Sequence, residues 1–286
     1  MALKANFIME KHPLNKYVRE DVLPHILCPG CGIGTVINAV ARALKNLEVP
    51  PEDVVVVSGI GCSGRASGYF NTDSVHTTHG RALPLATAIK ITKPHMKVIV
   101  IAGDGDLFAI GGNHFIHSAR RNIDLTVIAV NNFNYGMTGG QLGPTTPSHA
   151  VTSTSKQGNF EHPFNLVHLA AAAGAVYVAR WTTFHVNLLT KSIEKAISKR
   201  GFSFIDVISQ CPTYFDRYNR LGDAVSALKL FQKRSVIKNG YDPALAIADP
   251  FDKIICGEFV NKERPEYSER LQNIIKERMR EVVKNE

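Results

Sequence analysis

The sequence contains no apolar run long enough to cross a membrane as a helix. Its most apolar stretch, residues 169–179, has about half of the roughly 20 residues that a crossing needs. Near the start, Lys4, Glu10 and Lys11 stand where a secretory signal peptide would carry its apolar core. These absences argue against a membrane protein or a secreted protein, and they predict a cytoplasmic one.

The chain also lacks a block of charge of one sign. It has 33 Lys and Arg against 25 Asp and Glu, a net charge of +8, and acidic and basic residues are mixed where charge is densest, in residues 262–286. This pattern is not typical of a nucleic-acid-binding tract. The basic excess has two interpretations: an ordinary solvated surface, or a cationic face for an acidic protein partner or for anionic cofactors.

The order of apolar runs predicts an α/β protein. With 286 residues, of which 44% are hydrophobic, the chain can bury one large domain or two modest ones. Helical and strand-like segments alternate, which favours a doubly wound, mainly parallel sheet. The expected helices cover residues 35–47, 81–92, 107–120, 164–173 and 184–199, and the expected strands cover 54–58, 97–102, 125–131, 175–179 and 203–208.

The chain is expected to divide near residue 221. Residues 1–221 hold all of these segments and are expected to form the α/β domain. From Gly222 onward the sequence shows no strand signals and becomes charged and amphipathic. We therefore expect a C-terminal arm over residues 222–286, with a helix at about 265–283, that packs on this chain or on a partner subunit.

A short segment rich in glycine and aspartate, Gly103-Asp104-Gly105-Asp106, follows the expected strand 97–102. Taken alone, Gly-Asp-Gly most often marks a turn. However, Asn132 follows the next expected strand, and the carboxyl ends of neighbouring parallel strands lie at one edge of a sheet. There, Asp104 and Asn132 can offer oxygen atoms to one hard cation, while the glycines let a diphosphate approach the backbone. The pairing predicts a metal-diphosphate site.

The same segment, together with Asn131-Asn132, resembles the fingerprint of thiamine diphosphate enzymes, in which Gly-Asp-Gly is followed by Asn-Asn. The resemblance implies that Asp104, the side chain of Asn132 and the backbone carbonyl of Asn134 bind Mg²⁺. It also places the N-terminus of the helix expected near Leu107 against the diphosphate.

The loop that starts at Asn132 and runs to about residue 162 is longer than compact domains usually need. Its position at the expected metal ligand favours an active-site loop over a disordered linker. Residues 135–141 of this loop are expected to cover the cofactor, among them Gly136, Met137 and Thr138.

Four of the five cysteines lie in segments whose glycines or prolines could fold the backbone around a cluster. Cys28 and Cys31 form Cys-Pro-Gly-Cys, Cys62 lies in Gly-Ile-Gly-Cys-Ser-Gly, and Cys211 precedes a proline. A close pair alone would fit zinc or a redox pair, and single buried cysteines are mostly small hydrophobic residues. One pair plus two dispersed cysteines at the ends of expected strands better suits a Cys₄ iron-sulfur cluster. Cys256 lacks such a context and is expected to be a free thiol.

The two sets of motifs together resemble the β subunit of 2-oxoacid:ferredoxin oxidoreductases, over roughly residues 10–220. The resemblance implies a thiamine-diphosphate-binding fold with one four-iron four-sulfur cluster beside the cofactor. The implied cluster ligands are Cys28, Cys31, Cys62 and Cys211. The implied cofactor contacts are Ile60, Gly61, Cys62, Ser63, His79, Gly80, Arg81, Gly103, Asp104, Gly105, Asp106, Asn132, Asn134, Gly136, Met137 and Thr138.

The implied reaction is the oxidative decarboxylation of a 2-oxoacid with coenzyme A, which gives an acyl-CoA and CO₂ while electrons pass through the cluster to ferredoxin. In this family the glutamate that activates thiamine belongs to a partner α subunit. The resemblance therefore implies an obligate heteromer, with any further small subunits and clusters on other chains, because this sequence lacks the closely spaced cysteine runs of ferredoxin modules. No nucleic acid or membrane partner is expected.

Arg65 stands three residues after Cys62, where members of this family commonly place a basic residue near the substrate. Its guanidinium can pair with a carboxylate, and the surrounding motifs look most like the 2-oxoglutarate enzymes. Arg65 could instead form a structural ion pair. The substrate could instead be pyruvate or a broad range of 2-oxoacids. Two other functional classes stay open: a thiamine-dependent non-oxidative decarboxylase, and a zinc-stabilised interaction subunit without activity.

Overall fold

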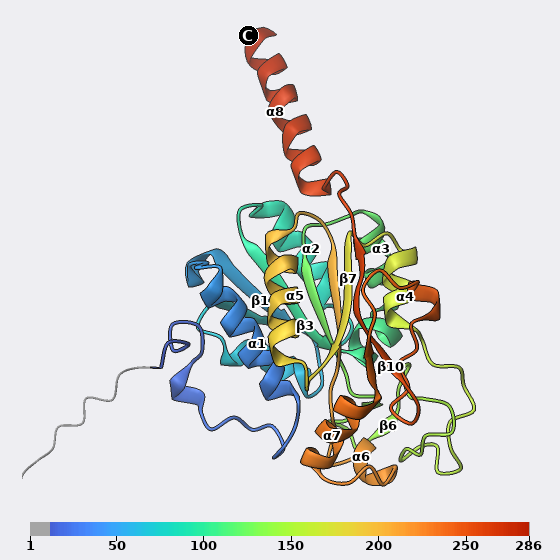
Figure 1. Ribbon diagram of the computed structural model, residues 1–286. Helices are drawn as coiled ribbons and strands as arrows, with labels where there is room; N and C mark the ends of the chain where they lie inside the picture. The colour runs from blue at the N-terminus through green and yellow to red at the C-terminus, as the bar shows by residue number, and fades with distance from the viewer. Residues whose placement is uncertain (1–11, 286) are drawn as a thin grey trace, which may run out of the picture.

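A central eight-stranded sheet organises the protein, in a computed structural model that describes residues 12–285 (Figure 1). All neighbouring strands are parallel except β10 and β7, which are antiparallel. In spatial order the strands are β2 (Asp73–His76), β1 (Val54–Ser58), β3 (Lys97–Gly103), β4 (Thr126–Asn131), β8 (Ser203–Ile208), β7 (Tyr177–Thr182), β10 (Ile254–Asn261) and β9 (Ser235–Ile237).

Helices cover both faces of the sheet, so its central strands are buried along their whole length. Every residue of β1, β4, β7 and β8 is buried, as expected for parallel strands between two helical layers. One layer contains α1 (Ile33–Asn46) and α5 (Val186–Ser198), and the other contains α2 (Ala82–Thr92), α3 (Gly112–Arg120) and α4 (Leu166–Ala172). The expected doubly wound, mainly parallel α/β fold is confirmed.

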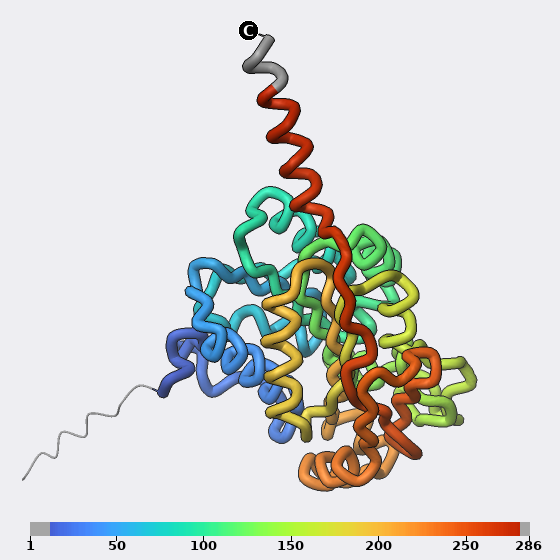
Figure 2. Tube along the Cα trace, turned by 45° about the horizontal axis from the view of Figure 1, so that its top comes forward, coloured from blue at the N-terminus to red at the C-terminus, as the bar shows by residue number. Residues whose placement is uncertain are grey.

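The expectation that the chain after Gly222 contains no strand is wrong. Helix α7 (Ala224–Arg234) is followed by β9 and β10, which extend the sheet, and β10 pairs with β7. Because β9 and β10 are parallel, the chain crosses back between them over residues 238–253, where the described structure has only the 3₁₀ turn Pro243–Leu245. Among the described residues 12–285, α8 (Tyr267–Asn285) is the element that extends away from the body as an arm (Figure 2).

Local departures from the expected elements lie near the glycines. The helix expected at 107–120 is divided into a π-helical segment, Gly105–Ile110, and α3. A 3₁₀ helix, Ser63–Tyr69, and the exposed edge strand β2 occupy the region after β1 where no element was expected. Among the described helices, none is both long enough and apolar enough to span a bilayer.

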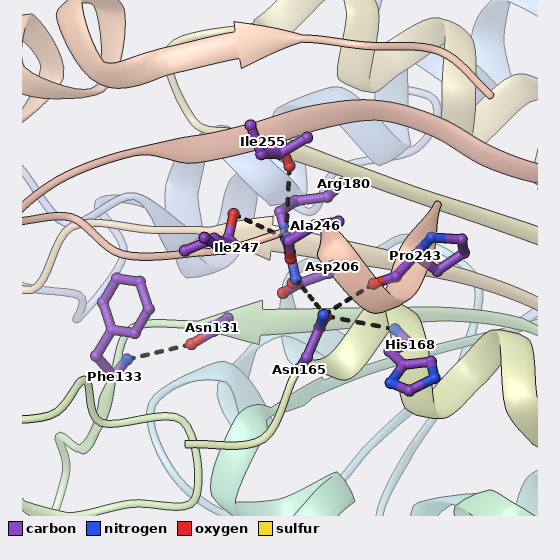
Figure 3. A network of polar contacts seen from close by, with 10 residues as sticks. All are labelled: Asn131, Phe133, Asn165, His168, Arg180, Asp206, Pro243, Ala246, Ile247 and Ile255. Carbon is purple, nitrogen blue, oxygen red and sulfur yellow. Dashed lines mark hydrogen bonds and ion pairs between the residues drawn. The ribbon is translucent and has the colours of Figure 1, made fainter. Parts of the chain in front are cut away.

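A buried ion pair attaches the connection before β10 to the sheet. Arg180 on β7 donates from Nε to Asp206 on β8 at 2.7 Å, and both side chains are at most 1% exposed. The same guanidinium donates to the carbonyl oxygens of Ala246, Ile247 and Ile255 (Figure 3). These bonds hold the backbone of residues 246–255 against β7.

Candidate active site

A cavity of about 110 Å³ opens at the carboxyl ends of β1, β3 and β4. This edge of a parallel sheet is the usual ligand site in open α/β folds. The structure brings together here all the expected cofactor contacts except Gly80 and Arg81. The lining residues are Ile60, Gly61, Cys62, Ser63, His79, Gly103, Asp104, Gly105, Asp106, Val130, Asn132, Asn134, Tyr135, Gly136, Met137 and Thr138.

Two glycines of the cavity have positions that a side chain would disturb. A Cβ atom on Gly105 would lie 2.2 Å from Cε1 of Tyr135. Gly61 has a φ of +105°, a conformation that glycine adopts without strain, and no atom lies within 4 Å of the place where its Cβ would be. At Gly61 the cavity wall is therefore bare backbone, as a site for a diphosphate requires, whereas glycine at position 105 makes room for the ring of Tyr135.

Oxygen atoms from two strand ends face the same part of the cavity. Asp104 is 2% exposed, and its Oδ2 accepts a hydrogen bond from the hydroxyl of Thr145. Gly143 lies close to both Asp104 and Asn134, since a Cβ atom placed on it would be 3.6 Å from Oδ2 of Asp104 and 3.5 Å from Cα of Asn134. Asn134 in turn donates from Nδ2 to the carbonyl of Asn132 at 2.7 Å. Carboxylate and amide oxygens are the ligands that Mg²⁺ prefers.

Burial raises the pKa of Asp104 to about 7. Its hydrogen bonds to Thr145 and to the backbone N–H of Gly105 act in the opposite direction, because they stabilise the charged form. A bound cation would do the same more strongly. The site thus contains a carboxylate whose charge is costly until a positive partner is present.

Asp106 connects the segments that form the rim of the cavity. Its Oδ1 accepts hydrogen bonds from the backbone N–H of Ile60 at 3.0 Å and of Gly80 at 2.9 Å, and it contacts Nδ1 of His79. Gly80 is therefore joined to the site through Asp106. Arg81 is exposed and does not line the cavity.

The four cysteines singled out in the sequence lie near one another at the same edge. Burial raises the pKa of Cys31 to about 12, and negative charge on Cys211, Cys62 and Cys28 adds to the increase. Burial similarly raises the pKa of Cys62 to about 11. These thiols would become thiolates only with a positive group among them.

The cysteines also adjoin the cavity. Cys62 lines it, and Sγ of Cys211 lies 4.0 Å from Oδ1 of Asn134. A Cβ atom on Gly136 would lie 3.5 Å from both Sγ of Cys62 and Nδ2 of Asn132. In the part of the chain that the structure describes, no group of three or more His, Cys, Asp or Glu side chains is arranged to hold a metal ion.

Cys256 is separate from this group. It is fully buried in β10, and burial raises its pKa to about 12. It forms no disulfide.

Arg65 lies outside the cavity. It is an exposed residue of the 3₁₀ helix that follows Cys62. Within residues 12–285 its guanidinium forms no ion pair, so this part of the chain offers no partner for the structural ion pair that was the alternative role of Arg65. Its surroundings are those of a surface that a second subunit could cover.

Sequence reasoning did not single out two residues that shape the site, Val130 and Thr145, and it included Tyr135 only as part of the segment expected to cover the cofactor. Val130 lies within β4, and its place in the apolar run predicts only that it is buried. Tyr135 belongs to the loop expected to cover the cofactor, but its packing against Gly105 depends on how that loop folds back. Thr145 lies further along the loop, where no spacing rule links it to Asp104.

The chain resembles several known proteins. Residues 59–207 match the family described as thiamine pyrophosphate enzyme, C-terminal TPP binding domain. Over 264 residues the chain is 51% identical to the 2-oxoglutarate synthase subunit KorB of Methanocaldococcus jannaschii, which covers 92% of this chain and 97% of that protein. Over 229 residues it is 39% identical to subunit beta of 2-oxoacid:ferredoxin oxidoreductase 2 of Aeropyrum pernix, a match that covers 79% of this chain and 72% of that protein.

A solved structure shows the same likeness in three dimensions. It is described as 2-oxoglutarate:ferredoxin oxidoreductase from Magnetococcus marinus with 2-oxoglutarate, coenzyme A and succinyl-CoA bound. The two chains superpose with a TM-score of 0.82 at 30% identity, over 97% of this chain and 94% of that one. The family expected from the motifs is confirmed, and this chain belongs to the β subunits of the 2-oxoacid:ferredoxin oxidoreductases.

Proposed function

We propose that the chain is the β subunit of an enzyme that oxidises 2-oxoglutarate with coenzyme A to succinyl-CoA and CO₂, and that passes two electrons, one at a time, to ferredoxin. One observation carries the proposal. Cys62 both lines the cavity and belongs to the group of four cysteines, so a cofactor and a cluster held by these residues would be neighbours. The proposed complex works in the cytoplasm, where coenzyme A and ferredoxin are available.

The cavity residues fit thiamine diphosphate bound through Mg²⁺. Asp104, the side chain of Asn132 and the backbone of Asn134 would supply oxygen ligands to the cation. The backbone at Gly61 and the helical N–H groups that begin at Gly105 would receive the diphosphate. The cofactor would supply a nucleophilic carbon and take up the electrons left after decarboxylation.

A partner α subunit would complete the site. The cavity of about 110 Å³ is well below the roughly 300–1,000 Å³ of ordinary ligand pockets, so this chain alone encloses only part of such a cofactor. We assign to that subunit the pyrimidine-binding domain and the activating glutamate. Coenzyme A and any further small subunits would also be bound in the assembled complex.

The four cysteines suit an iron-sulfur cluster better than zinc. One zinc ion would draw its sulfur ligands to about 3.8 Å from one another, since Zn–S bonds of about 2.3 Å form a tetrahedron. No three His, Cys, Asp or Glu side chains in the described range 12–285 are arranged to hold a metal ion in that way. The thiols nevertheless influence one another's pKa, as expected for ligands spaced around a larger cluster.

The direct test is anaerobic co-purification of this chain with its α subunit, followed by analysis of iron, sulfide, zinc and thiamine. We expect about four iron and four sulfide per chain, an absorbance near 400 nm that bleaches on reduction, and one thiamine diphosphate per active site. A colourless but active decarboxylase would instead support the non-oxidative alternative. A colourless, zinc-containing and inactive complex would support the interaction subunit.

The substrate preference is tested by replacing Arg65 with Ala. If the guanidinium pairs with the distal carboxylate of 2-oxoglutarate, kcat/KM for 2-oxoglutarate should fall by about 10- to 100-fold, as for loss of a charged hydrogen bond. Pyruvate has no distal carboxylate, so its kcat/KM should change by less than about threefold. An equal decrease for both substrates would remove the specificity role, and Arg65→Lys should restore part of the loss.

A further inference from the structure

One of the four grouped cysteines is exposed. Cys28 is exposed, Cys31 and Cys62 are partly buried, and Cys211 is buried. The same loop presents Ile26, which is 72% exposed, and Leu23, which is 48% exposed. A cluster held by these thiols would therefore lie closest to solvent beside Cys28, within an apolar patch of the surface.

Helices α6 (Phe215–Tyr218) and α7 lie beside this loop. A Cβ atom on Gly30 would lie 2.2 Å from Cβ of Ala224, the first residue of α7, and Gln210 donates to the carbonyl of Gly30 at 3.0 Å. Figure 1 shows α6 and α7 together at the end of the molecule where the N-terminal loop arrives. Val225, which is 59% exposed, adds to the apolar patch.

The segment that contains α6 and α7 is strongly cationic at its surface. Its exposed charged residues are four cations, Arg217, Arg220, Lys229 and Lys233, and one carboxylate, Asp223. Asp223 already accepts a hydrogen bond from the backbone N–H of Ser226 at the start of α7. Within residues 12–285 none of the four cations forms an ion pair. Arg217 lies over the rings of Tyr214 and Tyr218, at 5.9 and 5.5 Å from their centroids, and keeps its charge at the surface.

We propose that the exposed surface of α6 and α7, together with the Cys28 loop, is the docking surface for an acidic ferredoxin. The inference rests on the proposed function. Electron carriers form small, transient interfaces in which an apolar centre lies over the redox group and complementary charge speeds the encounter. This surface has both properties: Ile26 and Val225 are exposed apolar side chains on it, and the segment that contains α6 and α7 carries the four exposed cations.

A second cationic surface provides a matched comparison. Arg42 and Lys191 line a groove of about 520 Å³ between α1 and α5. Arg42 lies nine residues into α1, which begins next to Cys31, so it is about 14 Å along the helix from the cysteines. Charge at this groove contributes to the net field of the protein but not to the immediate surroundings of Cys28.

The experiment compares Arg220→Glu/Lys229→Glu with the control Arg42→Glu/Lys191→Glu, both in the anaerobic α–β complex. Each pair changes the net charge equally. Binding of oxidised ferredoxin is measured by biolayer interferometry at several salt concentrations, and kinetics are measured with ferredoxin and with the dye methyl viologen. We expect the α6–α7 pair to raise Kd and KM for ferredoxin at least about tenfold at low salt, with a smaller salt dependence. The control should change both by less than about twofold.

Dye-linked oxidation of 2-oxoglutarate and the absorbance of the cluster should be unchanged in both pairs. Equal effects of the two pairs, a larger effect of the control pair, or no effect of the α6–α7 pair would overturn the docking surface. Failure of the proposed function has a different signature, because the wild-type complex would then show no dye-linked oxidation of 2-oxoglutarate. Absence of ferredoxin binding to the wild-type complex would also overturn the docking surface.

Discussion

Replacement of Asp104 by Asn is expected to remove thiamine diphosphate from the purified complex and to reduce 2-oxoglutarate oxidation more than about 100-fold. Loss of a group that only orients a metal ligand typically lowers the affinity for the metal 10- to 100-fold. Asp104 would itself be a ligand, and the only charged one of the proposed three, so we expect a larger loss. The measurement is the thiamine diphosphate retained after gel filtration, together with its dependence on added Mg²⁺.

A purely structural role for Asp104 would give a different result. The carboxylate is buried and its pKa is raised to about 7, so at neutral pH and above the charged form opposes folding. Asn keeps the volume and can still accept a hydrogen bond from Thr145, and the apo complex should therefore melt no lower than wild type. A lower melting temperature with cofactor retained would contradict the cation-binding role.

Thr145→Val is the matched control for this site. The variant removes only the hydroxyl that donates to Asp104. We expect a loss of about 10- to 100-fold in the affinity for Mg²⁺, with activity recovered at high Mg²⁺. Asp104→Asn should show no such recovery.

The parts of the fold that sequence could predict are those with strong local signals. β1 and β8 have the expected bounds because their apolar runs end at residues that begin loops. That Asp104 and Asn132 line one cavity was predictable because they follow neighbouring strands, and parallel strands bring their carboxyl ends together. In both cases one rule about periodicity or topology was sufficient.

The parts that sequence reasoning missed depend on contacts between distant segments. β10 follows an irregular connection, and it pairs with β7, which lies more than 70 residues earlier in the chain. Asp106 lines the cavity, where it was expected to contact the cofactor, but sequence reasoning did not predict that its Oδ1 also joins Ile60 to Gly80. No local pattern distinguishes a carboxylate that holds two loops from one that faces a ligand.

The network around Arg180 provides the largest expected effect on stability. Arg180→Met leaves Asp206 as a buried charge without its partner, and Oδ1 of Asp206 already has no hydrogen-bond partner. Breaking a buried ion pair from one side typically costs about 3–5 kcal/mol. For a chain of this size the melting temperature should fall by about 10 °C, as measured by differential scanning calorimetry of the complex.

Lys195→Met is the control, because it removes the exposed pair between Lys195 and Glu258 and should cost less than about 1 kcal/mol. Arg180→Lys keeps the charge but not the planar set of donors, so its melting temperature should lie between those of wild type and Arg180→Met. It also measures the contribution of the network if the Met variant does not fold. Similar small losses in Arg180→Met and Lys195→Met would mean that the carbonyl oxygens of Ala246, Ile247 and Ile255 find other donors. The connection before β10 would then be fixed by its apolar contacts, and the charge pair between β7 and β8 would not be what attaches it to the sheet.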